Sequence, residues 1–156
     1  MPEKDGKKLI SENRKARHEY HFLEIFEAGL SLTGTEVKSL RNGRANLQDA
    51  YCKVENGEMW VYNMHISPYD FGNRANHDSK RPRRLLLHKV EIRRIYSKVR
   101  EKGYTIIPVK MYFSHGLAKL EIALAQGKKL YDKRQDMAER SARREIERGF
   151  KEQGRI

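Results

Sequence analysis

The sequence predicts a mainly β protein: a small closed or nearly closed β-barrel with two or three flanking helices and a basic C-terminal tail. Five or six segments have the alternation or the aromatic content of strands, and glycine-containing turns or bends separate them. Two further segments have the apolar spacing of short helices. Beyond Gly127 apolar side chains become too sparse to order about 30 residues without a partner.

Composition indicates a polyanionic partner. The chain has 156 residues, a formal net charge of +12 and 38% hydrophobic residues. Lys and Arg at this density favour nucleic acid, which they bind with release of counterions, although an ordinary basic surface is the alternative. No apolar run approaches the ~20 residues of a membrane-spanning helix, and the first residues do not resemble a signal peptide.

The cysteine content favours a reducing compartment, and the spacing of the histidines does not indicate a metal site. Cys52 is the single cysteine, so no internal disulfide can form. The six histidines lack the spacing of zinc ligands. We expect a cytoplasmic monomer that needs no cofactor and makes no membrane contact.

The N-terminal part begins polar and then becomes basic. Residues 1–12 carry both charge signs and are predicted to form a mobile arm. Residues 13–18 (Asn-Arg-Lys-Ala-Arg-His) suit either a phosphate-facing strip or a solvated flank. Residues 20–32 predict a long strand with a bulge or bend at Ala28-Gly29, which leaves Glu27 at the bend.

The next segments predict a helix and a hairpin. Residues 33–43 have the pattern of a short helix capped by Thr35. Strands 47–54 and 59–66 are expected around the turn Asn56-Gly57. Four apolar side chains of the second strand share one face at period two, and we favour the core over a base-stacking surface for them. They are Trp60, Tyr62, Met64 and Ile66.

Residues 67–84 predict a long loop that ends in a cluster of cations. Lys80, Arg81, Arg83 and Arg84 suit an RNA backbone, and a solubilising flap is the alternative. His77-Asp78 is the one candidate acid–base pair, but sequence neighbours in extended chain point in different directions.

The rest of the body predicts a helix and two strands. Residues 88–102 have an apolar stripe and a basic face. Strands are expected at 104–113, where Pro108 marks an edge or a bulge, and at 117–125. The tail has acid-to-base pairs at i, i+4, so we expect it to be disordered when free and helical on a polyanion, with a solvated extension as the alternative.

Five short segments, taken together and in their order along the chain, are more informative than any one of them. They are residues 13–18, 34–41 (Gly-Thr-Glu-Val-Lys-Ser-Leu-Arg), 84–89 (Arg-Leu-Leu-Leu-His-Lys), 103–108 (Gly-Tyr-Thr-Ile-Ile-Pro) and 127–134 (Gly-Lys-Lys-Leu-Tyr-Asp-Lys-Arg). Each alone is weak, but together they resemble the small protein B family, the bacterial partners of transfer-messenger RNA (tmRNA, or SsrA RNA) in trans-translation. The resemblance runs from about residue 13 to residue 134.

The resemblance implies an OB-like barrel that binds the tRNA-like domain of tmRNA and completes the shape of a tRNA. The family's RNA contacts fall here on Asn13, Glu27 and Leu86. With the basic side chains identified above, the expected RNA-binding set is Asn13, Arg14, Lys15, Arg17, His18, Glu27, Lys80, Arg81, Arg83, Arg84 and Leu86. The loop departs mildly from the family, which often has His-Asp-Pro where this chain has His77-Asp78-Ser79.

The resemblance also implies a partner in the ribosome. The complex would enter ribosomes stalled without a stop codon, with elongation factor Tu as an indirect partner through charged tmRNA. The tail would enter the empty mRNA channel and contact small-subunit rRNA. Its decoding-centre contacts fall on Tyr131, Asp132, Lys133 and Arg134, and beyond these only a helical, basic character carries over.

The resulting interpretation is an RNA-binding adaptor without enzymatic activity. It divides the chain into an arm at 1–12, a barrel at 13–126 and a tail at 127–156. We expect a chain that ends at Gln126 to bind the tRNA-like RNA but not to support tagging. A resident ribosomal protein and a nuclease that uses His77 and Asp78 remain as alternatives.

Overall fold

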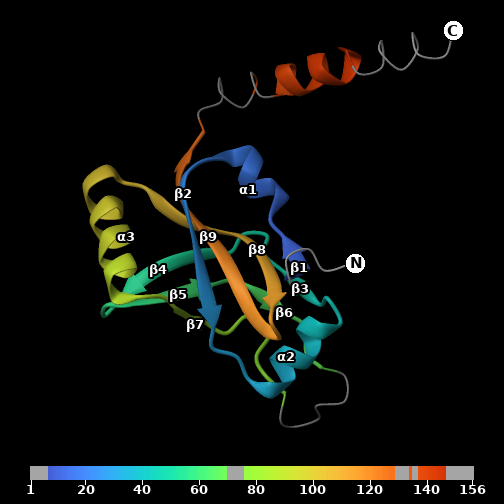
Figure 1. Cartoon of the computed structure of the whole chain (residues 1–156), viewed down its shortest axis with the longest axis vertical. Helices are drawn as coiled ribbons and strands as arrows, with labels where there is room; N and C mark the ends of the chain where they lie inside the picture. The colour runs from blue at the N-terminus through green and yellow to red at the C-terminus, as the bar shows by residue number, and fades with distance from the viewer. Residues whose placement is uncertain (1–6, 70–75, 129–133, 135–136, 147–156) are drawn as a thin grey trace, which may run out of the picture.

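The structure is a computed structural model that describes residues 7–69, 76–128, 134 and 137–146. Residues 137–146 are helical, and Figure 1 shows them apart from the barrel. The other elements, in chain order, are β1 (Lys7–Glu12), α1 (Arg14–Glu19), β2 (Tyr20–Leu30), α2 (Gly34–Arg41), β3 (Ala45–Asn46), β4 (Tyr51–Glu55), β5 (Glu58–Tyr62), β6 (His65–Ile66), β7 (Arg83–Leu86), α3 (Lys89–Lys102), β8 (Thr105–Ser114) and β9 (Leu117–Gly127).

The predicted barrel is confirmed. Six antiparallel strands form a closed ring in the order β8-β4-β5-β7-β2-β9, and β9 returns to β8. Strand β1 lies along the C-terminal half of β8, whereas β4 meets the N-terminal part of β8 through the pair Cys52 and Ile106. Figure 1 shows α3 at one end of the barrel, α2 near the other, and α1 beside the point where the chain leaves β9.

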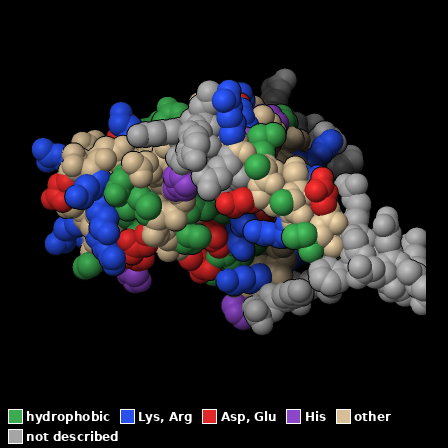
Figure 2. Space-filling view, turned by 90° about the horizontal axis from the view of Figure 1, so that it is seen from above, with side chains coloured by type: hydrophobic (Ala, Val, Ile, Leu, Met, Phe, Trp, Pro, Cys, Tyr) green, Lys and Arg blue, Asp and Glu red, His purple; other side chains and the backbone are tan. Residues whose placement is uncertain are grey.

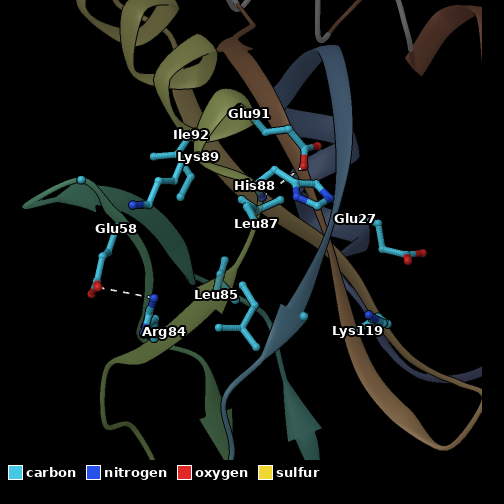
Figure 3. A pocket seen from close by; sticks show the side chains of 13 residues that line it. Glu27, Glu58, Arg84, Leu85, Leu87, His88, Lys89, Glu91, Ile92 and Lys119 are labelled. Atoms are coloured by element: carbon cyan, nitrogen blue, oxygen red, sulfur yellow. Dashed lines mark hydrogen bonds and ion pairs between the residues drawn. The ribbon is translucent and has the colours of Figure 1, made fainter.

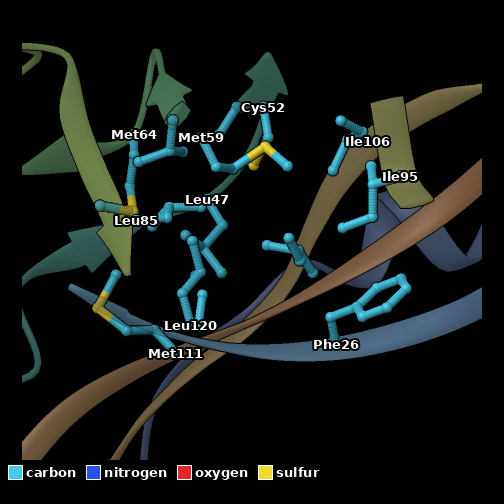
Figure 4. Close-up of a cluster of buried hydrophobic side chains, with 14 of the residues drawn as sticks. Phe26, Leu47, Cys52, Met59, Met64, Leu85, Ile95, Ile106, Met111 and Leu120 are labelled. Carbon is cyan, nitrogen blue, oxygen red and sulfur yellow. The ribbon is translucent and has the colours of Figure 1, made fainter. Parts of the chain in front are cut away.

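The barrel interior forms the main hydrophobic core. Its side chains come from the strands and from the inner face of α3, and Figure 4 shows them converging. Met59, Leu85 and Leu120 are at most 1% exposed, and Ile95 of α3 closes one end. Cys52 belongs to this core, and burial raises the pKa of its thiol. A smaller cluster under α1 joins Ala16, Ile107 and Ala125.

The alternation of β5 differs from the prediction. Met59 and Val61 face the core, whereas Trp60 and Tyr62 are half-buried on the outside of the barrel. Asn63 has a φ of 59°, and this residue changes which side of the chain faces inward. Met64 and Ile66 are therefore buried as expected, but the core placement of Trp60 and Tyr62 was wrong.

Strand β1 corrects the predicted arm. Lys7–Glu12 pair with β8 from Ser114 to Lys110 instead of forming a mobile segment. Ile10 packs against the core, which gives this polar strand an apolar anchor. Residues 1–6 lie outside the described residues.

Strand β2 bulges at a different place from the one predicted. The register shift lies between Phe22 and Glu24, not at Ala28-Gly29. At Gly29 the strand is instead paired on both sides, with Leu86 of β7 and Lys119 of β9. A Cβ at Gly29 would lie 3.3 Å from the Leu86 Cβ, so the absence of a side chain at Gly29 allows β7 to approach closely.

The helices begin and end largely where the sequence predicts. Thr33, and not Thr35, caps α2, and Glu36 bonds back to the Thr33 backbone to complete a capping box. Helix α3 follows His88 and ends at Gly103, which has a φ of 68°. The bulge expected at Pro108 is confirmed by the register shift between Pro108 and Lys110.

A buried carboxylate joins α2 to the start of β7. Glu36 is 0% exposed and accepts hydrogen bonds from Arg81 and Arg83. The Arg83 guanidinium, also 0% exposed, donates to the carbonyls of Met64 (2.6 Å), Ser79 (3.2 Å) and Asp78 (3.3 Å). Burial alone would raise the pKa of Glu36, but hydrogen bonds from Arg81, the Thr33 backbone and Arg83 outweigh it and hold the pKa below its ordinary value.

The first prediction compares two adjacent arginines. We expect Arg83→Ala to lower the free energy of unfolding by about 3–5 kcal/mol, because it removes a partner of a buried charge and leaves carbonyls without donors. Arg84→Ala is the control, since the exposed Arg84 lies 3.4 Å from Glu58, and should cost less than about 1 kcal/mol. Urea unfolding followed by circular dichroism measures both. Equal losses would contradict the structural role of Arg83.

The second prediction concerns acid stability. Because the folded pKa of Glu36 is depressed, its contribution is present at neutral pH and is lost as the pH falls through that folded pKa. We expect the unfolding free energy of the wild type to decline from about pH 5 towards about pH 2 more steeply than that of Glu36→Gln. Urea titrations across this range provide the measurement, and parallel declines would contradict the prediction.

Candidate nucleic-acid interface

An open groove of about 670 Å³ lies where β2, β7 and the N-terminal end of α3 meet. Three residues expected to contact RNA line it together: Glu27, Arg84 and Leu86. Figure 3 shows Arg84 beside Glu58 on the β7 side of β2, and Glu27 with Lys119 on the β9 side. The tertiary structure therefore unites residues that lie almost 60 positions apart in the sequence (27 against 86).

Leu86 is displayed to solvent by the alternation of β7. Arg83 and Leu85 point inward, so Arg84 and Leu86 point outward. Leu86 is 50% exposed, and its Cβ occupies the space above Gly29. An exposed leucine fixed in this way can contact the apolar face of a base or ribose.

Glu27 lies on the outer surface of β2 and is held by two residues that sequence reasoning missed. The hydroxyl of Tyr112 on β8 donates to Glu27 Oε2, and Lys7 Nζ of β1 lies 3.8 Å from the same oxygen. Burial, with further contributions from the neighbouring Glu27 and Glu121 carboxylates, raises the pKa of Tyr112, so its phenol stays protonated and acts as a donor. The bulge after Pro108 breaks the alternation of β8, so the sequence pattern could not place Tyr112 on this face.

Helix α1 carries a second set of expected contacts. Arg14, Lys15 and Arg17 are exposed and His18 is half-buried. Lys15 lies 3.6 Å from Asp49, and Arg17 lies 3.4 Å from Glu12, so part of this charge is already balanced. The strip therefore forms a helix in which Lys15 and Arg17 already lie beside carboxylates.

The root of the tail is attached to α1. The Lys128 backbone amide donates to the Glu19 carbonyl at 2.8 Å, and Lys128 Nζ donates to the Arg17 carbonyl at 3.3 Å. Strand β9 also runs to Gly127, one residue beyond the expected end of the barrel, and Gly127 pairs with Tyr20. The basic helix and the beginning of the tail thus lie at the same end of the molecule (Figure 1).

Asn13 is not on the surface. It is 6% exposed, and its Oδ1 accepts from the Ala16 amide as the N-cap of α1. Its Nδ2 donates to the carbonyls of Pro108 (3.0 Å) and Leu47 (3.3 Å). The structure therefore gives Asn13 an internal role: it fixes α1 on the barrel.

The four cations of the loop do not form one surface. Arg83 is buried and Arg81 is ion-paired with Glu36. Lys80 and Arg84 are exposed. Arg81 and Arg83 therefore hold the loop, whereas Lys80 and Arg84 lie on the surface, with Arg84 beside Glu58. Figure 2 shows Lys and Arg side chains spread over one face of the molecule with acidic side chains between them.

His77 is a structural residue of the same loop. Its Nδ1 lies 2.9 Å from Thr35 Oγ1 and its Nε2 lies 2.9 Å from the Ile66 carbonyl oxygen. The Asp78 carboxylate accepts from the Lys80 amide at 3.0 Å. Both ring nitrogens are thus used within the protein, which disfavours the acid–base pair considered from the sequence.

In the tail, the expected contacts Tyr131, Asp132 and Lys133 lie outside the described residues, whereas Arg134 is helical and exposed. Residues 137–146 form a helix with every side chain exposed. The expected disorder of the free tail and its helix on a polyanion both stay predictions.

Features of two other protein classes are absent from the described residues. No group of three or more His, Cys, Asp or Glu side chains among the described residues is arranged to hold a metal ion. In the same part of the chain, no helix is both long and apolar enough to cross a membrane.

The fold and these surfaces define a small β-barrel protein with a basic helix and a basic tail. Comparison with known proteins identifies its family. The model of the SmpB protein family matches residues 10–152. The SsrA-binding protein of Pelotomaculum thermopropionicum is 64% identical over 149 residues, which are 96% of this chain and 97% of that protein. The SsrA-binding protein of Carboxydothermus hydrogenoformans is 60% identical over 144 residues, 92% of this chain and 97% of that protein.

A solved structure agrees with the sequence comparison. It is described as "tmRNA-SmpB: a journey to the center of the bacterial ribosome", and its matching chain is 50% identical to this one. The TM-score is 0.65, with 77% of this chain and 85% of that chain covered. The chain belongs to the SmpB family.

The third prediction tests the internal role of Asn13. We expect Asn13→Ala to lower the free energy of unfolding by about 2–4 kcal/mol, because the helix loses its cap and two buried carbonyls lose their donor. The neighbouring Arg14→Ala is the control and should stay within about 0.5 kcal/mol of the wild type. Denaturant unfolding measures both, and an unchanged stability of Asn13→Ala would show that the internal contacts contribute little.

Proposed function

We propose that this protein binds the tRNA-like domain of tmRNA with its barrel and delivers that RNA to stalled ribosomes for trans-translation. The observation that carries the proposal is identity along nearly the whole chain: relatives named SsrA-binding protein match it at 60–64% over 92–96% of its length. The solved tmRNA-SmpB structure supports both an RNA and a ribosomal partner.

The barrel offers two surfaces for the RNA. The groove contributes Glu27, Arg84 and Leu86, and the loop before it contributes Lys80. Helix α1 contributes the exposed Arg14, Lys15 and Arg17 together with His18. Cationic side chains would contact phosphates, while Glu27 and Leu86 would contact base or ribose. Asn13, Arg81 and Arg83 then act indirectly, because their hydrogen bonds hold the segments that carry these contacts.

The tail is proposed to act on the ribosome. Tyr131 can stack on an rRNA base, and Asp132, Lys133 and Arg134 are the proposed contacts in the decoding centre. The attachment of Lys128 to α1 fixes the point at which the chain leaves the barrel towards this segment. Elongation factor Tu enters the proposal only through charged tmRNA.

The protein is proposed to act as a cytoplasmic binding adaptor and not as a catalyst. The engagement of both His77 nitrogens with Thr35 and Ile66 supports this view, because that ring was the one candidate general base from the sequence. Arg83, buried beside the same loop, holds the Asp78 and Ser79 carbonyls. Residues 77–79 thereby connect α2 to the start of β7 through hydrogen bonds.

The fourth prediction separates barrel from tail. A chain that ends at Lys128 keeps the pairing of Gly127 and the contacts of Lys128 with α1. We expect it to bind a transcript of the tRNA-like domain within a fewfold of the full chain but to fail in tagging, because the barrel contacts remain and the proposed decoding contacts are gone. Filter binding measures the affinity, and tagging of a stalled peptide in a reconstituted translation system measures the activity.

Two results would contradict the proposal. If the truncated chain no longer bound the transcript, the division between RNA-binding barrel and ribosome-binding tail would be wrong. If the full chain showed no preference for the tRNA-like transcript over an unrelated RNA of equal length, the proposed substrate itself would be wrong. The comparison is made at one fixed salt concentration, since phosphate contacts are strongly salt-dependent.

A further inference from the structure

A buried phenol ring lies beneath charged side chains on the outer surface of β1, β8, β9 and β2. Tyr112 of β8 is only 3% exposed. It pairs with Leu9 of β1 on one side and Lys119 of β9 on the other. The ring is therefore fixed in the middle of a sheet surface and is not a mobile side chain at an edge.

Two lysines cover this ring. Lys7 Nζ lies 5.0 Å from the ring centroid and Lys110 Nζ lies 6.0 Å from it, both within the range of cation–π attraction. Lys110 is in turn 3.6 Å from Glu121. The lysines help to shield the ring from water, and the burial of the ring fixes the position of the Tyr112 hydroxyl.

That hydroxyl binds one oxygen of Glu27. It donates to Oε2, and Lys7 Nζ lies 3.8 Å from the same atom. Among the described residues no hydrogen bond or ion pair reaches Oε1, and the Glu27 side chain is 45% exposed. One carboxylate oxygen is thus anchored, and the other faces outward at the end of the groove that contains Leu86.

We propose that Tyr112 is a positioning residue that presents Oε1 of Glu27 to a hydrogen-bond donor of the bound RNA. The inference rests on the proposed RNA-binding function and extends it to a residue that makes no RNA contact itself. A carboxylate only accepts hydrogen bonds, so its partner must be an N–H of a base or the 2′-hydroxyl of a ribose.

The surrounding charges suit this role. A carboxylate beside a polyanion would be repelled by phosphates, but Lys7 and Lys110 offset the charges of Glu27 and Glu121. Tyr112 adds a neutral donor, which fixes the carboxylate without cancelling its charge. An exposed glutamate without such a partner would lose rotamer entropy on binding, and the anchoring reduces this cost.

The fifth prediction is a double-mutant cycle in the full chain. Tyr112→Phe removes only the hydroxyl and keeps the ring under its lysines. We expect Tyr112→Phe and Glu27→Gln each to weaken binding of the tRNA-like transcript, by up to about tenfold. The double variant should be no weaker than Glu27→Gln alone, because the hydroxyl acts only through that carboxylate. Fluorescence anisotropy titrations at one salt concentration measure the affinities.

Tyr62→Phe is the matched control. Interaction with the Glu55 carboxylate raises the pKa of Tyr62, but this pair belongs to the outer face of β4 and β5. Removal of the Tyr62 hydroxyl should change the affinity by less than about twofold. Melting temperatures of all variants are measured alongside, and the titrations are made well below the lowest of them.

The source of the donor can be identified by substitution in the RNA. Transcripts with inosine in place of guanosine lack a base amino group, and transcripts with 2′-deoxy nucleotides lack the ribose hydroxyl. The substitution that weakens the wild type but not Glu27→Gln identifies the partner of Oε1. If neither substitution weakens binding by the wild type, the donor is a base imino group or the amino group of adenine or cytosine.

The outcomes distinguish this inference from the proposed function. The positioning role is wrong if the wild type binds the transcript and Glu27→Gln weakens this binding while Tyr112→Phe does not. Independent, multiplying effects of the two substitutions would also overturn it, since they would show that Tyr112 acts without Glu27. A wild type that does not bind the transcript would overturn the proposed function instead.

Discussion

The buried ion pair between Glu36 and Arg83 sets the position of the groove lined by Glu27, Arg84 and Leu86. Arg83 is the first residue of β7, and its inward direction fixes the alternation of the strand. Leu85 then enters the core, while Arg84 and Leu86 reach the surface. A buried charge pair needs complete hydrogen bonding to persist, and here one arginine satisfies carbonyls from three residues as well as Glu36. The apolar contact surface at Leu86 is thus a consequence of a polar interaction inside.

Two carboxylates of this chain illustrate how surroundings decide a role. Glu36 is fully buried, and its oxygens are used by Arg81, Arg83 and the Thr33 amide. Glu27 is half-exposed, with one oxygen held by Tyr112 and the other directed outward. The first carboxylate can only stabilise the fold, whereas the second is still able to accept a hydrogen bond from a ligand.

Helix α1 connects the barrel to the tail. Asn13 fixes the beginning of this helix to the barrel, and the end of the helix holds Lys128 at the root of the tail.

Much of the candidate site could be predicted, because the family resemblance identified Glu27 and Leu86 and the charge pattern identified α1. The structure uses three of the expected RNA contacts, Asn13, Arg81 and Arg83, inside the protein. Each carries donors that can bind either an acceptor within the protein or an acceptor on RNA. Which of the two a side chain meets depends on partners that lie up to 95 residues away in the sequence. Tyr112 was missed because the bulge after Pro108 changes the direction of its side chain and because its partner Glu27 is 85 residues away.

The sequence by itself determined the barrel class, the turn at Asn56-Gly57, the helix that ends at Gly103 and the change of character at Gly127, because these depend on local periodicity and on residues that favour one backbone conformation. Only the tertiary structure decided which side of a strand faces the core. Asn63 with its positive φ shifts the alternation, so Met64 and Ile66 are buried after it although Trp60 and Tyr62 before it are not. The bulge after Pro108 likewise interrupts the alternation that would place Tyr112. A single residue of irregular backbone reverses the direction of every later side chain in a strand, and local patterns do not reveal it.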